Sequence, residues 1–426
     1  MKRIHVAVKI KPVLQSEKEN KTTVYWKAKS TNTIYQTAYP NKVFYFDDVF
    51  NEQEDNETVY LHFCSSLVRL VIQGYNGTIM TFGQVSSGKT HTILGDEDKK
   101  VDGLLFFIIR HIFELIEDLY GNKEILIRVS CFEIYKEEIR DLLSSTNESL
   151  NLLEENGHVK VSLLSEHVVQ QPREIFDFFR EAESRRIKGD TLFSENGSKS
   201  HLIFRMVFEI CDNTDGAIHI SELNLVDFAG LLVSEQEMNE FPKCKNDSLT
   251  FLSEIILQLR HEQAKDVNYE RSKLTRILKN SFGGKALTLL ICTVIPTNLI
   301  ETFYALQFGI AAMHVKNESK VVASAEKSLI CKLRGLHYLN FDPIESAARL
   351  QQAQGMDETI KKMISYCEYF LIPVLKMKTY NLKSLCGSSS STLRCRKSLA
   401  SHSQPFIIKT KQNVKHHYIP ENKKKV

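Results

Sequence analysis

Two hydrophobic periodicities alternate along the first 317 residues of the chain. Apolar runs typical of β-strands occupy residues 43–50, 77–82, 125–135, 202–210, 223–227 and 286–296. Apolar residues at helical spacing follow at 105–119 and at 249–259. Strands that are interleaved with helices are typical of a layered α/β fold.

The pattern weakens beyond this region. Residues 344–371 carry one helical stripe of about two heptads, which is too short to indicate a coiled coil. Residues 376–426 hold twelve Lys/Arg and one acid, a net charge of +11, whereas residues 318–375 hold seven of each sign. The sequence therefore predicts a globular domain at 1–317, a partly helical neck or linker at 318–375 and a disordered basic tail at 376–426.

The composition is that of a soluble globular protein, with 42% hydrophobic and 25% charged residues. No run of 18 apolar residues exists, so no membrane-spanning helix is expected. The charged residues close to the N-terminus also argue against a secretory signal. Nine cysteines include no CxxC pair, which argues against a disulfide framework or a zinc site and favours a reducing compartment.

A phosphate-binding motif stands at residues 83–90, where GQVSSGKT fits G-x-x-x-x-G-K-[ST]. Its glycines allow backbone amides to curl around phosphate oxygens, Lys89 reaches the β- and γ-phosphates, and the Thr90 hydroxyl is a Mg²⁺ ligand. The strand-like run at 77–82 supplies the context that a P-loop requires. A flexible Gly/Ser turn is the alternative interpretation.

A P-loop also needs an acidic residue at the end of a second strand to hold the magnesium shell. Asp227 follows the apolar run LNLV and precedes Ala-Gly, so it fits this role. An isolated Asp after a strand is otherwise a common turn residue.

Four segments in order closely resemble the kinesin motor domain over about residues 1–317. They are YNGTIMTFGQVSSGKTHT at 75–92, SKSH at 198–201, NLVDFAG at 224–230 and SKLTRILKNSFGGKA at 272–286. A further segment, VYWKAKSTNTIYQ at 24–36, is most similar to the centromere-associated, or kinetochore, branch of that family. The resemblance implies a P-loop NTPase fold, in which helices flank both faces of a central, mostly parallel or mixed sheet.

The resemblance also implies a role for each matching residue, with ATP and Mg²⁺ as cofactors. Lys89, Ser198, Asp227 and Gly230 would form the catalytic set, and Thr90, Ser198 and Asp227 would surround the metal. The phosphates would lie in a cradle made of Gly83, Gln84, Val85, Ser86, Ser87, Gly88, Lys89 and Thr90. The adenine would be bordered by Lys9, Lys11 and Pro12 and stacked on His91, a residue that is otherwise best interpreted as an ordinary surface imidazole.

Microtubules are the partner that the family implies, and their exposed surface is acidic. In the segment 272–282, Lys273, Arg276 and Lys279 recur every three residues, while Leu and Phe side chains take the other side. Without the resemblance, an amphipathic helix with a solvated basic face would be the simpler interpretation; with it, microtubule contact is favoured. Neither a membrane nor a nucleic acid is an expected partner, and the oligomeric state stays open.

Both nucleotide-sensing switches depart from the family's pattern. The family's switch I reads NxxSSRSH, whereas residues 194–201 read SENGSKSH, with Gly197 for Ser and Lys199 for Arg. The family's switch II reads DLAGSE, whereas residues 227–232 end in Leu232. In the family this Arg and Glu pair when the switches close, but Lys lacks the planar fork of Arg and Leu removes the partner. An insertion that brings Glu235 into register is a conceivable alternative.

These departures leave three possible functions to compare. The first is an ATP-driven microtubule motor with microtubule-stimulated ATPase activity, located in the cytoplasm on the microtubule cytoskeleton and, for the kinetochore branch, on the spindle. The second is a nucleotide-binding microtubule adaptor with impaired hydrolysis, because the phosphate-binding motif is intact while the switch motifs that trigger hydrolysis are altered. The third, a small-molecule kinase or GTPase, is disfavoured because no Asn-Lys-x-Asp base-reading motif is present.

Overall fold

The computed structural model describes residues 2–96, 98–119, 121–146, 148–155, 158–191, 194–214, 216–233, 246–260 and 267–321, with the backbone alone at 158, 188–191 and 194–198. The predicted helical stripe and basic tail lie outside these residues, as do most of the predicted neck and Glu235. No helix in the described part is long and apolar enough to cross a membrane.

A ten-stranded mixed sheet forms the centre of the domain. From one edge to the other it is ordered β12 (Ser149–Leu150), β11 (Glu138–Asp141), β10 (Lys123–Tyr135), β18 (His201–Asp212), β19 (Ile218–Asp227), β7 (Gly77–Phe82), β20 (Leu287–Val294), β2 (His5–Ile10) and β6 (Asp48–Phe50). The tenth strand, β15 (His167–Val169), pairs with β10. Strands from β19 to β6 are parallel, and strands from β12 to β19 are antiparallel, so the predicted mixed sheet is confirmed.

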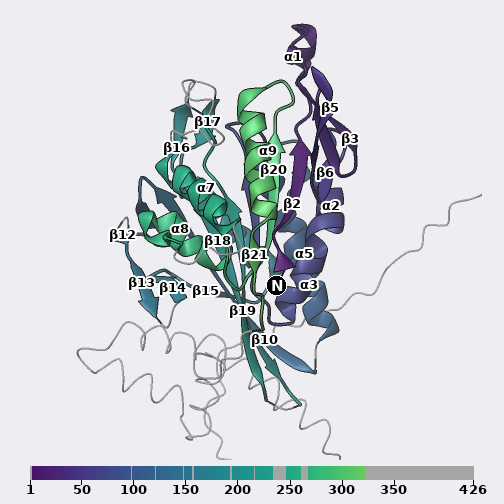
Figure 1. Cartoon of the computed structure of the whole chain (residues 1–426). Helices are drawn as coiled ribbons and strands as arrows, with labels where there is room; N and C mark the ends of the chain where they lie inside the picture. The colour runs from purple at the N-terminus through teal and green to yellow at the C-terminus, as the bar shows by residue number, and fades with distance from the viewer. Residues whose placement is uncertain are drawn as a thin grey trace, which may run out of the picture. The chain divides into compact units, whose positions relative to one another are not determined.

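Helices cover both faces of the sheet, as expected, because successive strand residues point to opposite sides. On β7, Ile79 packs into the cluster shared with α3 (Ser65–Ile72), α5 (Leu104–Asp118) and α6 (Pro172–Arg185). Its neighbour Met80 packs into the cluster shared with α7 (Asp247–Leu259), α8 (Lys273–Ile277) and α9 (Ile300–Met313) (Figure 1). The core therefore consists of two apolar layers, one on each side of the sheet.

Smaller elements complete the described part. The remaining strands are β1 (Lys2–Arg3), β3 (Trp26–Ser30), β4 (Thr33–Gln36), β5 (Tyr39–Tyr45), β8 (Gly95–Asp96), β9 (Val101–Asp102), β13 (Leu152–Glu155), β14 (His158–Val161), β16 (Lys188–Thr191), β17 (Ser194–Ser198) and β21 (Lys316–Asn317). The remaining helices are α1 (Gln15–Glu19), α2 (Asn56–Val59), η1 (Tyr60–Cys64), α4 (Lys89–Leu94), η2 (Tyr269–Arg271) and η3 (Leu278–Asn280).

Two sequence predictions need correction. The single strand expected at 43–50 is two strands, β5 and β6, because the chain bends at Asp47, whose carboxylate accepts the Val6 N–H at 2.8 Å and Arg3 Nη1 at 2.9 Å. The helix expected in the segment 272–282 ends at Ile277 and continues as the 3₁₀ turn η3. The strand β7 and the helix α5 match their predicted segments closely.

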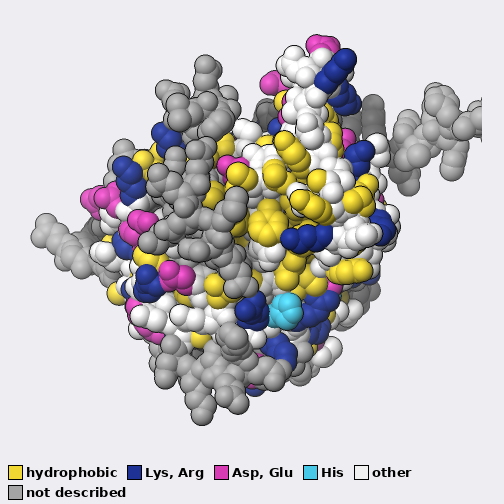
Figure 2. Space-filling model, turned by 45° about the horizontal axis from the view of Figure 1, so that its top comes forward, with side chains coloured by type: hydrophobic (Ala, Val, Ile, Leu, Met, Phe, Trp, Pro, Cys, Tyr) yellow, Lys and Arg dark blue, Asp and Glu magenta, His cyan; other side chains and the backbone are white. Residues whose placement is uncertain are grey.

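The outer side of α9 stays partly apolar. Figure 2 shows hydrophobic side chains gathered near the middle of the face that includes α9, flanked by Lys and Arg side chains. Leu299 and Ile300 at the start of α9 are exposed, and the Lys42 amine lies 5.5 Å from the Phe303 ring centroid. The Lys42 side chain thus covers part of the aromatic cluster of Trp26, Phe44 and Phe303.

Candidate functional site

The candidate site lies where the parallel strands end. The carboxyl ends of β2, β7, β19 and β20 meet at one edge of the sheet, which is where open α/β sheets bind ligands. The loop between β7 and α4 is the predicted P-loop. The loop therefore lies at this end of the sheet, next to residues from the neighbouring strands such as Thr293.

Glycine is required at two positions of this loop. A side chain on Gly83 would place its Cβ 2.1 Å from the Thr293 carbonyl oxygen at the end of β20. Gly88 has φ +97°, a left-handed conformation that other residues adopt only with strain. The Ser87 hydroxyl is 2.7 Å from the Thr293 hydroxyl, which ties the loop to β20. Local sequence thus determines the loop, and the neighbouring strand holds it.

Lys89 is buried directly beneath the loop. Its side chain amine donates hydrogen bonds to the carbonyl oxygens of Gly83 at 3.0 Å and Gln84 at 2.7 Å. Burial lowers the pKa of Lys89 to about 8, although the nearby Asp227 carboxylate opposes the change. The amine is therefore held by neutral carbonyls at the place where the motif predicts an anionic phosphate.

Asp227, at the end of β19, is the centre of a buried polar cluster. Its Oδ2 accepts hydrogen bonds from the Thr90 hydroxyl at 2.7 Å and from Arg186 Nη1 at 2.6 Å. Its Oδ1 accepts a third from the Thr81 hydroxyl at 3.2 Å. Burial by itself would raise the pKa of the Asp227 carboxyl, but Arg186 and Lys89 outweigh it and hold the pKa below its ordinary value.

Arg186 is one of the site residues that the sequence did not indicate. It follows α6 directly, its side chain is 0% exposed, and Nη2 donates to the Ser200 carbonyl at 2.8 Å. It therefore links Ser200, in the segment of switch I, to Asp227, at the start of switch II. The only signal is a pair of consecutive arginines at the end of an amphipathic helix, and nothing in the sequence separates the buried Arg186 from the more exposed Arg185.

A cavity of about 480 Å³ opens in front of this cluster. Eleven of the predicted site residues line it: Lys9, Lys11, Pro12, Val85, Ser86, Ser87, Gly88, Lys89, Thr90, His91 and Gly230. Gly83 and Gln84 lie behind the loop and contact Lys89 through their carbonyls, while Asp227 lies next to Thr90. The side chain of Ser198 is outside the described residues.

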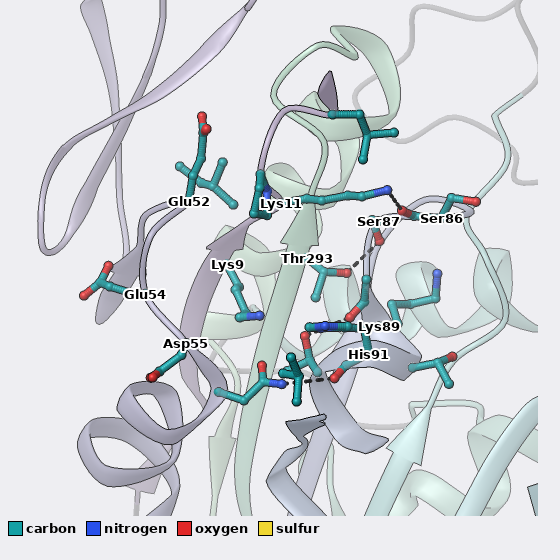
Figure 3. Close-up of a pocket in the computed structure, with 18 of the residues that line it drawn as sticks. Lys9, Lys11, Glu52, Glu54, Asp55, Ser86, Ser87, Lys89, His91 and Thr293 are labelled. Atoms are coloured by element: carbon teal, nitrogen blue, oxygen red, sulfur yellow. Dashed lines mark hydrogen bonds between the residues drawn. The ribbon is translucent and has the colours of Figure 1, made fainter. Parts of the chain in front are cut away.

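The far wall of the cavity carries carboxylates that the sequence did not single out. Figure 3 shows Glu52, Glu54 and Asp55 across the cavity from the P-loop residues. Burial lowers the pKa of Lys9 to about 8, and Asp55 opposes this change. The Lys11 amine donates to the Ser86 carbonyl at 2.7 Å, so it fastens the rim of the loop.

His91 lies between these two walls. Burial and the nearby Lys9 amine lower its pKa, so the ring is neutral at pH 7. The Asn56 side chain amide donates to the His91 carbonyl at 3.2 Å and to the Asp102 carbonyl at 2.9 Å. These bonds hold the backbone of α4 at the position where the adenine stack is predicted.

The cavity has the features that Mg-ATP requires. Its size lies within the range of small-molecule sites. A Cβ added to Gly88 would meet nothing within 4 Å, so the space beside the loop is open. The Thr90 hydroxyl beside the Asp227 carboxylate supplies the oxygen ligands that Mg²⁺ prefers.

The segment after β19 is packed against the P-loop. A Cβ on Gly230 would lie 2.4 Å from Cγ2 of Val85, and the Leu231 N–H donates to the Gly83 carbonyl at 2.9 Å. Leu231 is buried in the core, and Leu232 is half-buried. Lys199 in the segment of switch I is exposed.

His201 connects this segment to α7. The ring is 1% exposed, its Nδ1 accepts the Ala229 N–H at 3.1 Å, and its Nε2 lies 3.1 Å from the amide nitrogen of Asn246, the residue that caps α7. Burial lowers the pKa of His201 to about 4. His201 thus connects the segment after β19, which borders the cavity, to the residue that caps α7.

The three basic residues predicted to contact microtubules do not belong to this cavity. Lys273 and Arg276 lie on α8, and Lys279 lies on η3. All three side chains are partly exposed, while Leu274, Leu278 and Phe282 pack into the core. The amphipathic arrangement predicted for this segment is confirmed.

Comparison with known proteins shows which family the domain resembles. The model of the kinesin motor domain matches residues 9–315. The human centromere-associated protein E is 36% identical over 409 residues, and kinesin-related protein 4 of Dictyostelium discoideum is 36% identical over 342 residues. These alignments cover 92% and 78% of this chain but only 15% and 18% of the two relatives.

A solved structure of a fast kinesin has the same fold. It superposes with a TM-score of 0.66 at 29% sequence identity, covering 77% of this chain and 96% of that one.

Proposed function

Because the chain belongs to the kinesin motor domain family, we propose that it binds Mg-ATP in the cavity beside the P-loop and acts as an ATP-dependent microtubule motor whose hydrolysis is attenuated. Family membership implies the motor activity. The observation that supports the nucleotide site is the convergence of Lys89 and Thr90, which follow β7, with Asp227, which ends the neighbouring strand β19.

Each residue of the proposed site has a task that its surroundings support. The Lys89 amine would exchange its two carbonyl partners for phosphate oxygens, whose negative charge favours the protonated amine. Thr90 and Asp227, with Ser198, would hold the metal and its water, and the bound metal would neutralise charge on the β- and γ-phosphate oxygens. The Gly230 amide, beside Val85, would sense the γ-phosphate.

Attenuated hydrolysis follows from the switch residues. Phosphoryl transfer depends on groups that position water and stabilise charge. Leu232 can neither accept a proton nor orient water, and Lys199 has no carboxylate at that position with which to pair. The switch segments are tied instead by the buried Arg186, which contacts Ser200 and Asp227, and by the hydrogen bond from Ala229 to His201; neither tie supplies the missing Glu.

The second candidate is a microtubule adaptor that binds nucleotide without turning it over. The same Leu232 supports it, and the two candidates differ only in the rate of phosphate release. Similarity to the centromere-associated protein E at 36% identity further suggests a place on spindle microtubules near the kinetochore. Imaging of the tagged full chain in dividing cells against tubulin and a kinetochore marker tests this location.

Steady-state phosphate release, measured with and without microtubules, decides between a motor and an adaptor. We expect slow release in the parent. In the triple variant Gly197→Ser, Lys199→Arg, Leu232→Glu, the restored ion pair and hydroxyl should raise the microtubule-stimulated rate on the order of 10²-fold. Lys199→Arg alone is the matched control and should not raise it, because its acidic partner is still missing.

Two results would contradict parts of this proposal. Fast release in the parent would show that another group, such as Glu235, already supplies the missing function. A silent triple variant that still binds nucleotide would show that the pair is not what limits hydrolysis.

A further inference from the structure

The cations on the predicted microtubule face already have partners within the chain. Arg276 Nε lies 3.0 Å from Glu270 Oε2, and Lys279 Nζ lies 3.5 Å from Glu154 Oε1. Lys273 Nζ donates to the Leu150 carbonyl at 3.5 Å. Each of the three basic side chains that are expected to meet an acidic partner therefore already has a contact within the chain.

The two carboxylates reach this face from different directions. Glu154 belongs to β13, in the hairpin with β14 that lies beside α8 in Figure 1, and Glu270 belongs to η2, just before α8. Their side chains are 41% and 60% exposed, respectively. Both carboxylates are therefore open to solvent, as is Lys279, whereas Arg276 is 24% exposed; an approaching surface would meet both signs of charge.

Pairs that water reaches on at least one side, as both of these are, can be exchanged for other partners. An exposed pair contributes a factor of roughly five or less to an equilibrium, because water and salt screen it. An acidic partner must displace each carboxylate from its cation before it can pair with that cation, and this competition opposes binding. Each carboxylate therefore competes with the microtubule for its cation but does not prevent binding.

We infer that Glu154 and Glu270 act as built-in competitors that lower the affinity of the α8 face for the acidic surface of microtubules. The inference rests on the proposed microtubule function and adds a regulatory property to that same face. A change that neutralises either carboxylate strengthens binding, although neither residue contributes a favourable contact to the partner.

Glu154→Gln and Glu270→Gln test this inference, because Gln keeps the shape of the side chain and removes its charge. Microtubule co-sedimentation of the full chain is measured over a series of salt concentrations. Each variant should bind about two- to fivefold more tightly than the parent at low salt, and the double variant about tenfold more tightly. The gain should shrink as salt rises, because the Debye length falls to about 8 Å at physiological ionic strength.

Two controls separate competition from a general change in charge. Glu155→Gln makes the same change one residue away on the same hairpin, but Glu155 pairs with Lys160, 2.9 Å away, so its gain should be smaller than that of Glu154→Gln. In a Lys279→Gln background, Glu154→Gln should bring little gain, because no cation is left to release. A gain that persists in that background, or equal gains for Glu154→Gln and Glu155→Gln, overturns the inference.

Failure of the inference and failure of the proposed function look different. If the parent pellets with microtubules and the Gln variants pellet no better, the inference is wrong while the proposed function stands. If neither the parent nor any variant pellets at low salt in any nucleotide state, the microtubule contact itself is wrong.

Discussion

The P-loop cluster and the α8 face both depend on paired charges, but the pairs differ in burial. Arg186 and Asp227 are 0% and 2% exposed and are held by several hydrogen bonds, whereas Lys279 and Glu154 are 42% and 41% exposed and lie 3.5 Å apart. A buried pair has one arrangement, because breaking it leaves an uncompensated charge in the core. An exposed pair can exchange partners at little cost.

This difference matches the tasks proposed for the two regions. The nucleotide site needs groups that are already in position, because positioning is most of what phosphoryl transfer requires. The partner face needs contacts that form and break in each cycle. The predictions below test how far burial separates the two regions.

The largest effect is expected at Arg186. Arg186→Leu leaves the Asp227 carboxylate buried without its cation, so the free energy of unfolding should fall by about 3–5 kcal/mol. Arg173→Leu on α6 is the control, because the Arg173 side chain is 88% exposed and lies 3.7 Å from Asp177. Its free energy of unfolding should fall by no more than about 0.5 kcal/mol. Urea unfolding of both variants gives the values, and similar losses would erase the contrast between buried and exposed pairs.

The stability of the nucleotide side should depend on pH through His201. The pKa of its imidazole is about 4 in the folded protein and 6.5 ordinarily, so between these values the unfolded chain binds a proton that the folded chain does not. The free energy of unfolding should therefore fall as pH falls through this window, by at most roughly 3 kcal/mol. Unfolding measured at pH 7, 5.5 and 4.5 checks the slope.

His201→Gln is the matched variant for this slope. Its absolute stability is expected to be lower, but the part of the pH dependence that belongs to residue 201 should vanish. An unchanged slope would assign the dependence to other groups.

Lys89→Ala should weaken nucleotide binding roughly 10- to 100-fold, because the variant lacks the charged donor that faces the β- and γ-phosphates. Titration with a fluorescent ATP analogue measures the affinity, and a thermal melt shows whether the variant is folded. Lys99→Ala is the control, since Lys99 also lines the cavity but is exposed and pairs with Asp96. Unchanged affinity in Lys89→Ala would refute the P-loop assignment.

The smallest effect is expected on the α8 face. Replacing Lys273, Arg276 and Lys279 together with Ala should reduce microtubule affinity by about tenfold or less at low salt, because the charges of Arg276 and Lys279 are already shared with nearby acids. The reduction should fade at higher salt. Lys27→Ala with Lys29→Ala, two exposed lysines on β3, is the control and should pellet like the parent. A triple variant that also pellets like the parent would place the contact elsewhere.

Prediction from sequence succeeded where the signal is local. The strand β7 and the helix α5 have runs of apolar residues whose spacing decides their structure, and the P-loop is a contiguous motif whose spacing carries its chemistry. The strand predicted at 43–50 failed, because the hydrogen bonds that Asp47 makes to Arg3 and Val6 divide it, and those partners are about forty residues away.

The amino-acid sequence by itself determined the α/β order of elements and the phosphate-loop motif, and the proposed loss of the switch pair rests on its residues Lys199 and Leu232, since each is a property of neighbouring residues. Only the tertiary structure decided that Arg186 is buried against Asp227 and that Glu154 faces Lys279. These contacts join residues that are 41 and 125 positions apart, and their strength depends on burial. Burial is a property of the packed fold, because it depends on which distant side chains exclude water from a charge.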